Sequence, residues 1–193
     1  MDSHGWDARY EEKELVWSAE PNMFLPPIVE DLAPGTALDL ACGEGRNAIW
    51  LARDGWDVTG VDFSEVAIEK AHNLAGETQV DWVVADVTKY VPRRTFDLVL
   101  VVYVQLEPSD MRSLFANAVG ALASGGTIIA VGHALRNLSE GFGGPPYADI
   151  LWTEDLIAPL VADLDVVSLG EVLRSVEDSD VDAIDLLLHA KRL

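Results

Sequence analysis

Short apolar segments rich in β-forming residues recur along residues 37–131, with helical segments between most of them. They are Ala37–Leu40, Asp57–Val61, Val80–Ala85, Phe96–Val102 and Thr127–Val131. Strands that alternate with helices are typical of a parallel sheet covered by helices on both faces. The run from Asp97 to Val102 is almost continuously hydrophobic, which indicates a central strand that is buried on both sides.

Two of the intervening segments carry helix signals. Ser64 is expected to cap a helix that runs to about Gly76, with Ala67, Ala71 and Leu74 on its inner face. A second helix is expected after Pro108, with Ser109 as its N-cap and Gly125-Gly126 as its end. Its apolar stripe has helical spacing and consists of Met111, Leu114, Phe115, Ala118 and Leu122.

The last third of the chain has a different pattern. Asp165–Arg174 and Asp182–Lys191 are strand-like, and the short acidic connection between them predicts an antiparallel hairpin. Thr153 is expected to cap the preceding helix, which Pro159 should kink or divide in two. We therefore predict an α/β, Rossmann-like doubly wound sheet of seven strands, with five parallel strands and then a C-terminal antiparallel hairpin.

The charge balance narrows the class of partner. The chain of 193 residues has 13 Lys and Arg against 33 Asp and Glu, a formal net charge of −20. Nucleic-acid binders need clustered basic residues, so we expect no nucleic-acid partner. With one cysteine, no membrane-length apolar run and no leader-like N-terminus, a cytoplasmic location and no membrane association are expected. No metal site is predicted.

The strongest local signal runs from Leu38 to Asn47, where a strand leads through Gly43 and Gly45 into a helix that should end at Gly55. Glycine permits a sharp turn and a close ligand, and the helix start presents unpaired N–H groups to it. The spacing Gly43-x-Gly45-x-x-Ala48, with Asp62 downstream, also fits the dinucleotide-binding fingerprint. A plain turn without a ligand is the third interpretation.

Three features favour a different nucleoside cofactor over a nicotinamide. Asp39 precedes the glycine turn, which the dinucleotide fingerprint does not require. The third strand ends at Ala85-Asp86-Val87, which supplies a second carboxylate at a strand end. The final hairpin also replaces a second mononucleotide-binding half.

These stretches, together with Gly60-Val61-Asp62-Phe63-Ser64, resemble the class I S-adenosylmethionine-dependent methyltransferases. The resemblance is strongest to the small tellurite-resistance and thiopurine methyltransferase-like branch, and it spans nearly the whole chain. It implies one methyltransferase domain, 1–193, with an N-terminal lid segment at 1–35 and an acceptor-side loop at 133–152. The family usually has a glycine where this chain has Ala41.

The resemblance also implies the roles of the cofactor-binding residues. Asp62 would accept hydrogen bonds from the ribose hydroxyls of S-adenosylmethionine, and Asp86 from the adenine amino group. Asp39 would lie near the cofactor's ammonium group. The remaining residues expected around the cofactor are Trp17, Ala41, Gly43, Gly45, Phe63, Val87 and Val102.

Catalysis by this family places few demands on the protein, because the sulfonium is already a strong electrophile. His133, at the end of the fifth strand, is the candidate general base, and a soft nucleophile would need none. Arg174 corresponds to part of a His-Arg pair in the tellurite-resistance branch, but Leu173 replaces the histidine here. We therefore list His133 and Arg174 as candidate catalytic residues.

Three functions remain possible from the sequence. The first is methyl transfer by in-line displacement to a small-molecule acceptor. The second is a nicotinamide-dependent oxidoreductase, and the third is a non-catalytic S-adenosylmethionine-binding protein. The absence of an Asn/Asp-Pro-Pro-Tyr motif after the fourth strand, where the chain reads Tyr103-Val104-Gln105-Leu106, argues against methylation of nucleic-acid amino groups.

Overall fold

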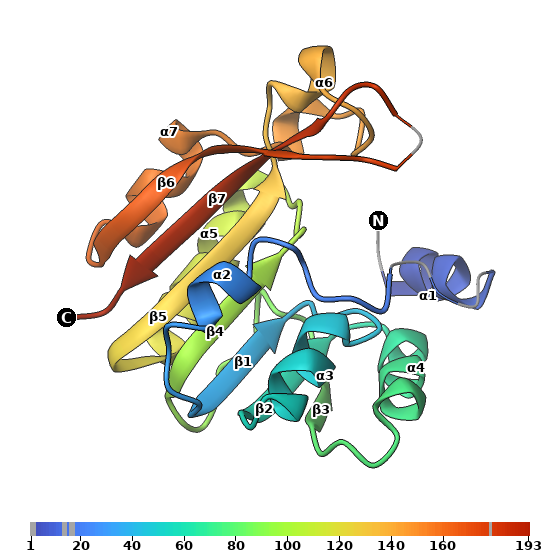
Figure 1. Cartoon of the computed structure of the whole chain (residues 1–193), viewed down its shortest axis with the longest axis vertical. Coiled ribbons are helices and arrows are strands. Elements are labelled where there is room, and N and C mark those ends of the chain that lie inside the picture. The colour runs from blue at the N-terminus through green and yellow to red at the C-terminus, as the bar shows by residue number, and fades with distance from the viewer. Residues whose placement is uncertain (1–2, 13–14, 16–17, 178) are drawn as a thin grey trace.

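A computed structural model describes residues 3–12, 15, 18–177 and 179–193. It contains a seven-stranded sheet in the order β3-β2-β1-β4-β5-β7-β6 (Figure 1). The strands are β1 (Thr36–Leu40), β2 (Asp57–Asp62), β3 (Asp81–Val84), β4 (Phe96–Val102), β5 (Leu122–His133), β6 (Asp165–Arg174) and β7 (Ala183–Lys191).

The predicted topology is confirmed. Strands β1 to β5 pair in parallel, whereas β7 pairs antiparallel with both β5 and β6. All seven predicted strands are present. The largest difference is β5, which starts five residues earlier and ends two residues later than the predicted Thr127–Val131, so that His133 is its last residue.

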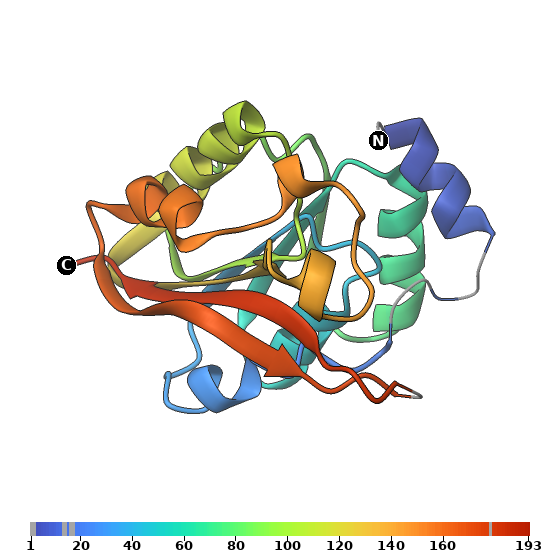
Figure 2. The same cartoon turned by 90° about the horizontal axis from the view of Figure 1, so that it is seen from above.

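Helices cover both faces of the sheet. On one face α5 (Pro108–Ala121) and α7 (Glu154–Ile157) lie over β4, β5 and β7, and on the other α2 (Pro26–Val29) and α3 (Arg46–Arg53) pack against β1 and β4 (Figure 2). α4 (Glu65–Ala75) packs against β2 and β3, and α1 (Ser3–Glu11) packs against α4. The remaining helical segments are α6 (Asn137–Glu140), η1 (Ala148–Ile150) and η2 (Ala158–Val161).

Two hydrophobic cores flank β4, as expected for a strand buried on both sides. Val99 and Val101 face the core beneath α5, whereas the alternate residues Leu98 and Leu100 face the core beneath α3. All four are fully buried. The period of two along this strand therefore serves both layers of helices.

Two cap predictions are confirmed. The hydroxyl of Ser64 accepts a hydrogen bond from the amide of Ala67, and that of Thr153 accepts one from Leu156. The helix after Thr153 is divided into α7 and η2, as Pro159 predicts.

Three local predictions are wrong. α5 begins at Pro108 with Glu107 as its cap residue, because proline at the first helical position has no N–H to satisfy. Ser109 is therefore inside the first turn. The helix ends at Ala121, and Gly125-Gly126 lie inside β5, where Gly125 has a positive φ of 78°. Leu74 is 42% exposed and lies outside the inner face of α4, which Ala67 and Ala71 form together with Ile68 and Ala75.

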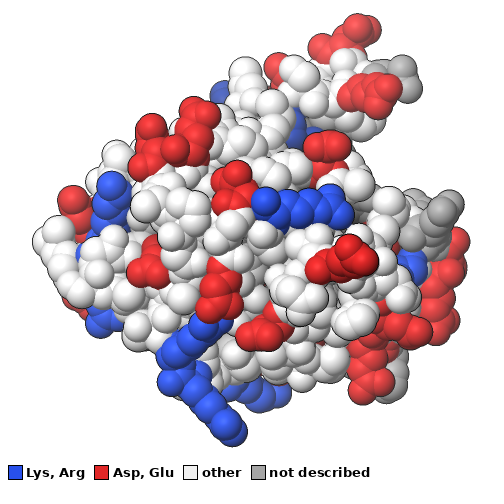
Figure 3. Space-filling model, turned by 60° about the horizontal axis from the view of Figure 1, so that its bottom comes forward, with Lys and Arg blue, Asp and Glu red and all other residues white. Residues whose placement is uncertain are grey.

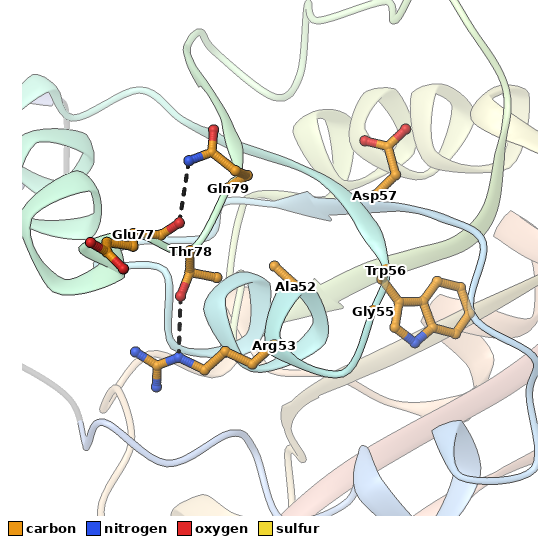
Figure 4. Close-up of a pocket in the computed structure, with 8 residues that line it drawn as sticks. All are labelled: Ala52, Arg53, Gly55, Trp56, Asp57, Glu77, Thr78 and Gln79. Atoms are coloured by element: carbon orange, nitrogen blue, oxygen red, sulfur yellow. Dashed lines mark hydrogen bonds between the residues drawn. The ribbon is translucent and has the colours of Figure 1, made fainter.

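The parallel strands align their carboxyl ends at one edge of the sheet, where the glycine turn, Asp62 and Asp86 lie. An open depression lies at the opposite edge, between the end of α3, the start of β2 and residues 77–79 (Figure 4). It contains none of the candidate site residues. Within the described part of the chain, no helix has the length and apolar character that a membrane crossing requires.

Candidate active site

The glycine turn between β1 and α3 depends on left-handed backbone conformations. Ala41, Gly43 and Gly45 have φ values of 57°, 55° and 82°. The turn is closed by the amide of Gly45, which donates to the carbonyl of Cys42 at 3.0 Å. Ala41 thus occupies a conformation that glycine adopts at lower cost, which explains why a glycine is usual at this position in the resembling family.

Trp82 on β3 fills the space beside the turn. A Cβ added to Gly45 would lie 2.4 Å from the Trp82 ring, and one added to Gly60 would lie 2.6 Å from it. These two glycines therefore allow the indole to pack between the sheet and the helices. For Gly45, the structure shows a packing role that the sequence interpretation did not include.

Asp62 organises the backbone at the carboxyl end of β2. Its Oδ2 accepts a hydrogen bond from the amide of Gly43 at 2.8 Å, and its Oδ1 accepts one from the amide of Ser64 at 2.9 Å. The residue is 4% exposed, and burial raises its pKa, against the lowering effect of these amides. Each carboxylate oxygen has two lone-pair directions, so Asp62 can still accept a hydrogen bond from a ligand hydroxyl.

Asp39 is a buried carboxylate with an incomplete set of partners. It is 1% exposed, and among the described residues its Oδ2 has no hydrogen-bond partner. Burial raises its pKa to about 7, which the charge of Arg46 opposes and that of Asp62 reinforces. A buried acceptor with a pKa near neutrality is suited to a cationic ligand group, which would favour its ionised form.

Asp86 is more exposed than Asp62 and already has protein partners. Its Oδ1 accepts from the hydroxyl of Thr88 at 2.7 Å, and its Oδ2 pairs with Lys89 at 2.7 Å. Burial would raise its pKa, but the hydrogen bonds from Lys89 and Thr88 lower it. Val87 and Val102 are buried and Phe63 is half-buried, all at this carboxyl edge of the sheet.

Residues 18–25, which lead into α2, pass beside the carboxyl end of β1 (Figure 1). The amide of Asn22 donates to Oδ1 of Asn47 at 2.9 Å, and Arg46 donates to the hydroxyl of Ser18 at 3.2 Å. These contacts connect the segment to the first turn of α3, next to the glycine turn. Trp17, expected at the cofactor, lies outside the described residues.

A second polar group surrounds Asp185 on β7, which is fully buried. Its Oδ2 accepts from the Tyr103 hydroxyl at 2.7 Å and from Nε of Arg174 at 2.8 Å. Nδ1 of His133 lies 2.9 Å from its Oδ1. We call these four residues the Asp185 cluster. It joins the two candidate catalytic residues, His133 and Arg174, through a carboxylate that the sequence interpretation missed.

Tyr103 connects the cluster to the end of β4. It has a positive φ of 57°, and its ring stacks on His133 with the centroids 4.8 Å apart. The guanidinium of Arg174 lies over the same ring, 5.6 Å from its centroid. Burial raises the pKa of Tyr103 well above its ordinary value, and the nearby Asp185 charge adds to the rise. The hydroxyl is therefore a neutral hydrogen-bond donor.

Comparison with known proteins places this site in a family. Residues 37–126 match the methyltransferase domain family. Over 171 residues the chain is 28% identical to thiocyanate methyltransferase 1 of Arabidopsis thaliana. The aligned region covers 83% of this chain and 74% of that protein. The chain is an S-adenosylmethionine-dependent methyltransferase. The comparisons thus favour methyl transfer over the nicotinamide interpretation.

Solved structures confirm the methyltransferase fold. The N-methyltransferase NodS from Bradyrhizobium japonicum WM9, in complex with S-adenosyl-L-homocysteine, has a TM-score of 0.79 at 20% identity over 100% of this chain and 99% of that chain. TehB from Haemophilus influenzae has a TM-score of 0.76 at 18% identity, over 90% of this chain and 63% of that chain. The fold therefore agrees with the expected branch.

The residues at the carboxyl edge fit S-adenosylmethionine, the cofactor of this family. The unpartnered Oδ2 of Asp39 offers a buried acceptor to an ammonium group. Arg46 lies close enough to Asp39 to affect its pKa, and sequence reasoning did not include it. Asp185 and Tyr103 were missed as well. The only sequence signal for Asp185 is an acidic residue within the apolar run of 183–188.

Proposed function

We propose that this methyltransferase acts on a small molecule with a soft nucleophile, such as a thiol or thiocyanate, by in-line displacement. The observation that carries the proposal is the relationship to a thiocyanate methyltransferase across 83% of the chain. The bound cofactor supplies an electrophilic methyl group on a sulfonium. Soft sulfur nucleophiles react readily with such a centre once both partners are aligned.

The carboxyl edge supplies the cofactor contacts in this proposal. Asp62 and Asp86 bind the ribose and the adenine amino group, with Phe63 and Val87 beside the base. Asp39 attracts the ammonium group, and the left-handed turn at Ala41 and Gly43 leaves room for the methionine portion, next to Val102. The positions of these residues at one sheet edge support the assignment.

The acceptor side is formed by the Asp185 cluster and the loop at 133–152. His133 acts on the acceptor proton where there is one, and Arg174 attracts an acceptor with negative charge. A Cβ at Gly144 would lie 3.1 Å from Cγ of His133, so the loop covers the imidazole. The segment within 1–35 that contacts α3 closes the cofactor side. We place the activity in the cytoplasm.

An acceptor panel tests the proposal. The purified chain is incubated with S-adenosylmethionine and, separately, an alkyl thiol, thiocyanate, iodide, a phenol and a primary amine. We expect methylated thiol or thiocyanate at rates at least tenfold above the phenol and amine, by mass spectrometry and S-adenosylhomocysteine release. Preferred methylation of the phenol or the amine would contradict the proposal, as would cofactor binding without transfer to any of the five.

A further inference from the structure

The carboxylate of the Asp185 cluster contacts a histidine, a tyrosine and an arginine at or next to the ends of three other strands, and the proposed function gives it no part in binding the cofactor. We propose that Asp185 is a positioning residue that holds His133 as a general base for acceptors that bind as neutral thiols. The inference rests on the proposed function and deepens it, because it names a protonated sulfur nucleophile as the substrate class.

The contact between the two side chains determines the tautomer of the imidazole. Nδ1 of His133 lies 2.9 Å from Oδ1 of Asp185, within ion-pair distance, and among the described residues both buried atoms lack a hydrogen-bond partner, so each has only the other to pair with. An ionised carboxylate only accepts, so Nδ1 must carry the proton. A neutral imidazole has one donor and one acceptor nitrogen. Nε2 is therefore left as the acceptor, as a general base requires.

The faces of the imidazole are also covered. Tyr103 stacks on one side at a centroid distance of 4.8 Å and an interplanar angle of 30°. The backbone of Gly144 lies so close that an added Cβ would be 3.1 Å from the imidazole Cγ. The side chain of His133 retains 14% exposure. With Nδ1 held and the faces packed, the Nε2 edge is the part of the ring available to an acceptor.

The electrostatic environment keeps Asp185 ionised. Burial by itself would raise its pKa, but the close approach of His133 and the hydrogen bonds from Tyr103 and Arg174 lower it below the ordinary value. The charge of Arg174 acts in the same direction. A buried, ionised carboxylate stabilises the imidazolium that forms when His133 takes a proton.

The proposed step transfers a methyl group to the thiol sulfur and a proton to His133. The thiol sulfur forms a bond to the methyl carbon, and the bond from that carbon to the cofactor sulfur breaks, with its electron pair remaining on the departing sulfur. The S–H proton moves to Nε2 of His133. The products are a methyl thioether, S-adenosylhomocysteine and an imidazolium, which returns its proton to solvent. An acceptor that is already an anion, such as thiocyanate, needs no such transfer.

Asp185→Asn is the test because it reverses the preferred tautomer with little change in shape. Tyr103 and Arg174 both donate toward Oδ2, so the asparagine oxygen should occupy that side and its NH₂ group should face Nδ1. His133 would then be protonated at Nε2 and unable to accept. At pH 7.5 we expect kcat/KM to fall at least about 30-fold with an alkyl thiol but less than about threefold with thiocyanate. Asp163→Asn, at an exposed aspartate, is the matched control and should change neither.

The outcomes separate this inference from the proposed function. Equal losses with both acceptors would indicate a structural role and overturn the inference, as would a wild-type enzyme that methylates thiocyanate but no thiol. Inactivity of the wild type with both would overturn the proposed function itself.

An independent measurement needs no turnover. The imidazole nitrogen NMR spectrum of the cofactor-free protein, assigned with His133→Gln, should show His133 in the Nδ1–H form, and the Nε2–H form would overturn the inference.

Discussion

Tyr103 and Ala41 both have φ of 57°, in the left-handed region that side chains other than glycine rarely adopt. Each follows a parallel strand at the edge where the cofactor site lies. For a bulky residue the conformation costs about 1–3 kcal/mol and persists only where surrounding contacts hold it. At Tyr103 those contacts are the hydrogen bond to Asp185 and the stacking on His133. The strain therefore lies between the proposed cofactor-binding and acceptor sides.

Asp62→Ala should weaken binding of S-adenosylhomocysteine at least about tenfold, which corresponds to about 1.4 kcal/mol. The substitution removes the proposed ribose contact and also the acceptors for the amides of Gly43 and Ser64. Titration calorimetry measures the affinity, and circular dichroism checks that the variant is folded. Asp57→Ala is the control, because Asp57 lies at the opposite end of the same strand in an exposed pair with Arg94. Equal affinities in a folded Asp62→Ala protein would remove Asp62 from the site.

Asp39 makes cofactor binding dependent on pH. Its pKa in the folded protein is about 7, so a rise from pH 6 to pH 8 converts most of the population to the carboxylate. If the ammonium group of the cofactor binds the carboxylate, the affinity for S-adenosylhomocysteine should rise roughly tenfold over that range. Calorimetry at several pH values measures the change, and Asp39→Asn should bind with little pH dependence.

Ionisation of Asp39 should lower the free energy of unfolding, although it raises the affinity for the cofactor. The pKa of Asp39 is raised on folding from 3.8, so between about pH 4 and 7 the folded state binds more protons than the unfolded state. The contribution of Asp39 to the free energy of unfolding therefore decreases as the pH rises through this window. Asp39→Asn should show a smaller decrease in urea titrations. An identical pH dependence in both proteins would mean that Asp39 does not titrate there.

At the scale of elements, the acceptor-side loop is attached to β5 through Trp152. The indole N–H donates to the carbonyl of Val104 at 3.2 Å, and the backbone amide of Trp152 donates to the carbonyl of His133 at 2.9 Å. The ring packs against Gly132, the residue before His133. The loop end and the candidate base are therefore positioned by one buried side chain.

Gly132→Ala should destabilise the protein because its Cβ would lie 2.4 Å from the Trp152 ring. Overpacking of this kind lowers the free energy of unfolding by about 1–3 kcal/mol. Gly120→Ala is the matched control, since a Cβ there meets nothing within 4 Å and the residue lies inside α5. That variant should instead gain about 0.5–1 kcal/mol. Urea denaturation measures both, and equal stability of the two variants would contradict the packing argument.

At the scale of the whole molecule, acidic side chains are spread over the face shown in Figure 3 and interleaved with basic ones. A net charge of −20 therefore does not come from a single acidic patch on that face. Such a surface keeps a protein soluble and disfavours polyanionic partners. It carries no information about the acceptor.

Local sequence patterns determined most of the fold. The apolar run of β4, the caps at Ser64 and Thr153 and the short acidic connection before β7 each depend on residues close together in the chain. The glycine turn and the carboxylates at two strand ends were likewise predictable, because parallel strands align their carboxyl ends. The end of α5 was not, since the conformation of Gly125 depends on its place in β5 rather than on its neighbours in sequence.

The Asp185 cluster was assembled by tertiary structure alone. Asp185 follows Tyr103 by 82 residues and Arg174 by 11, yet β7 brings its carboxylate to both. No periodicity indicates which buried aspartate will meet a histidine, because antiparallel registry between β5 and β7 pairs His133 with Asp185. The sequence thus determined the carboxyl edge proposed for the cofactor, whereas long-range strand pairing determined which groups meet in the Asp185 cluster.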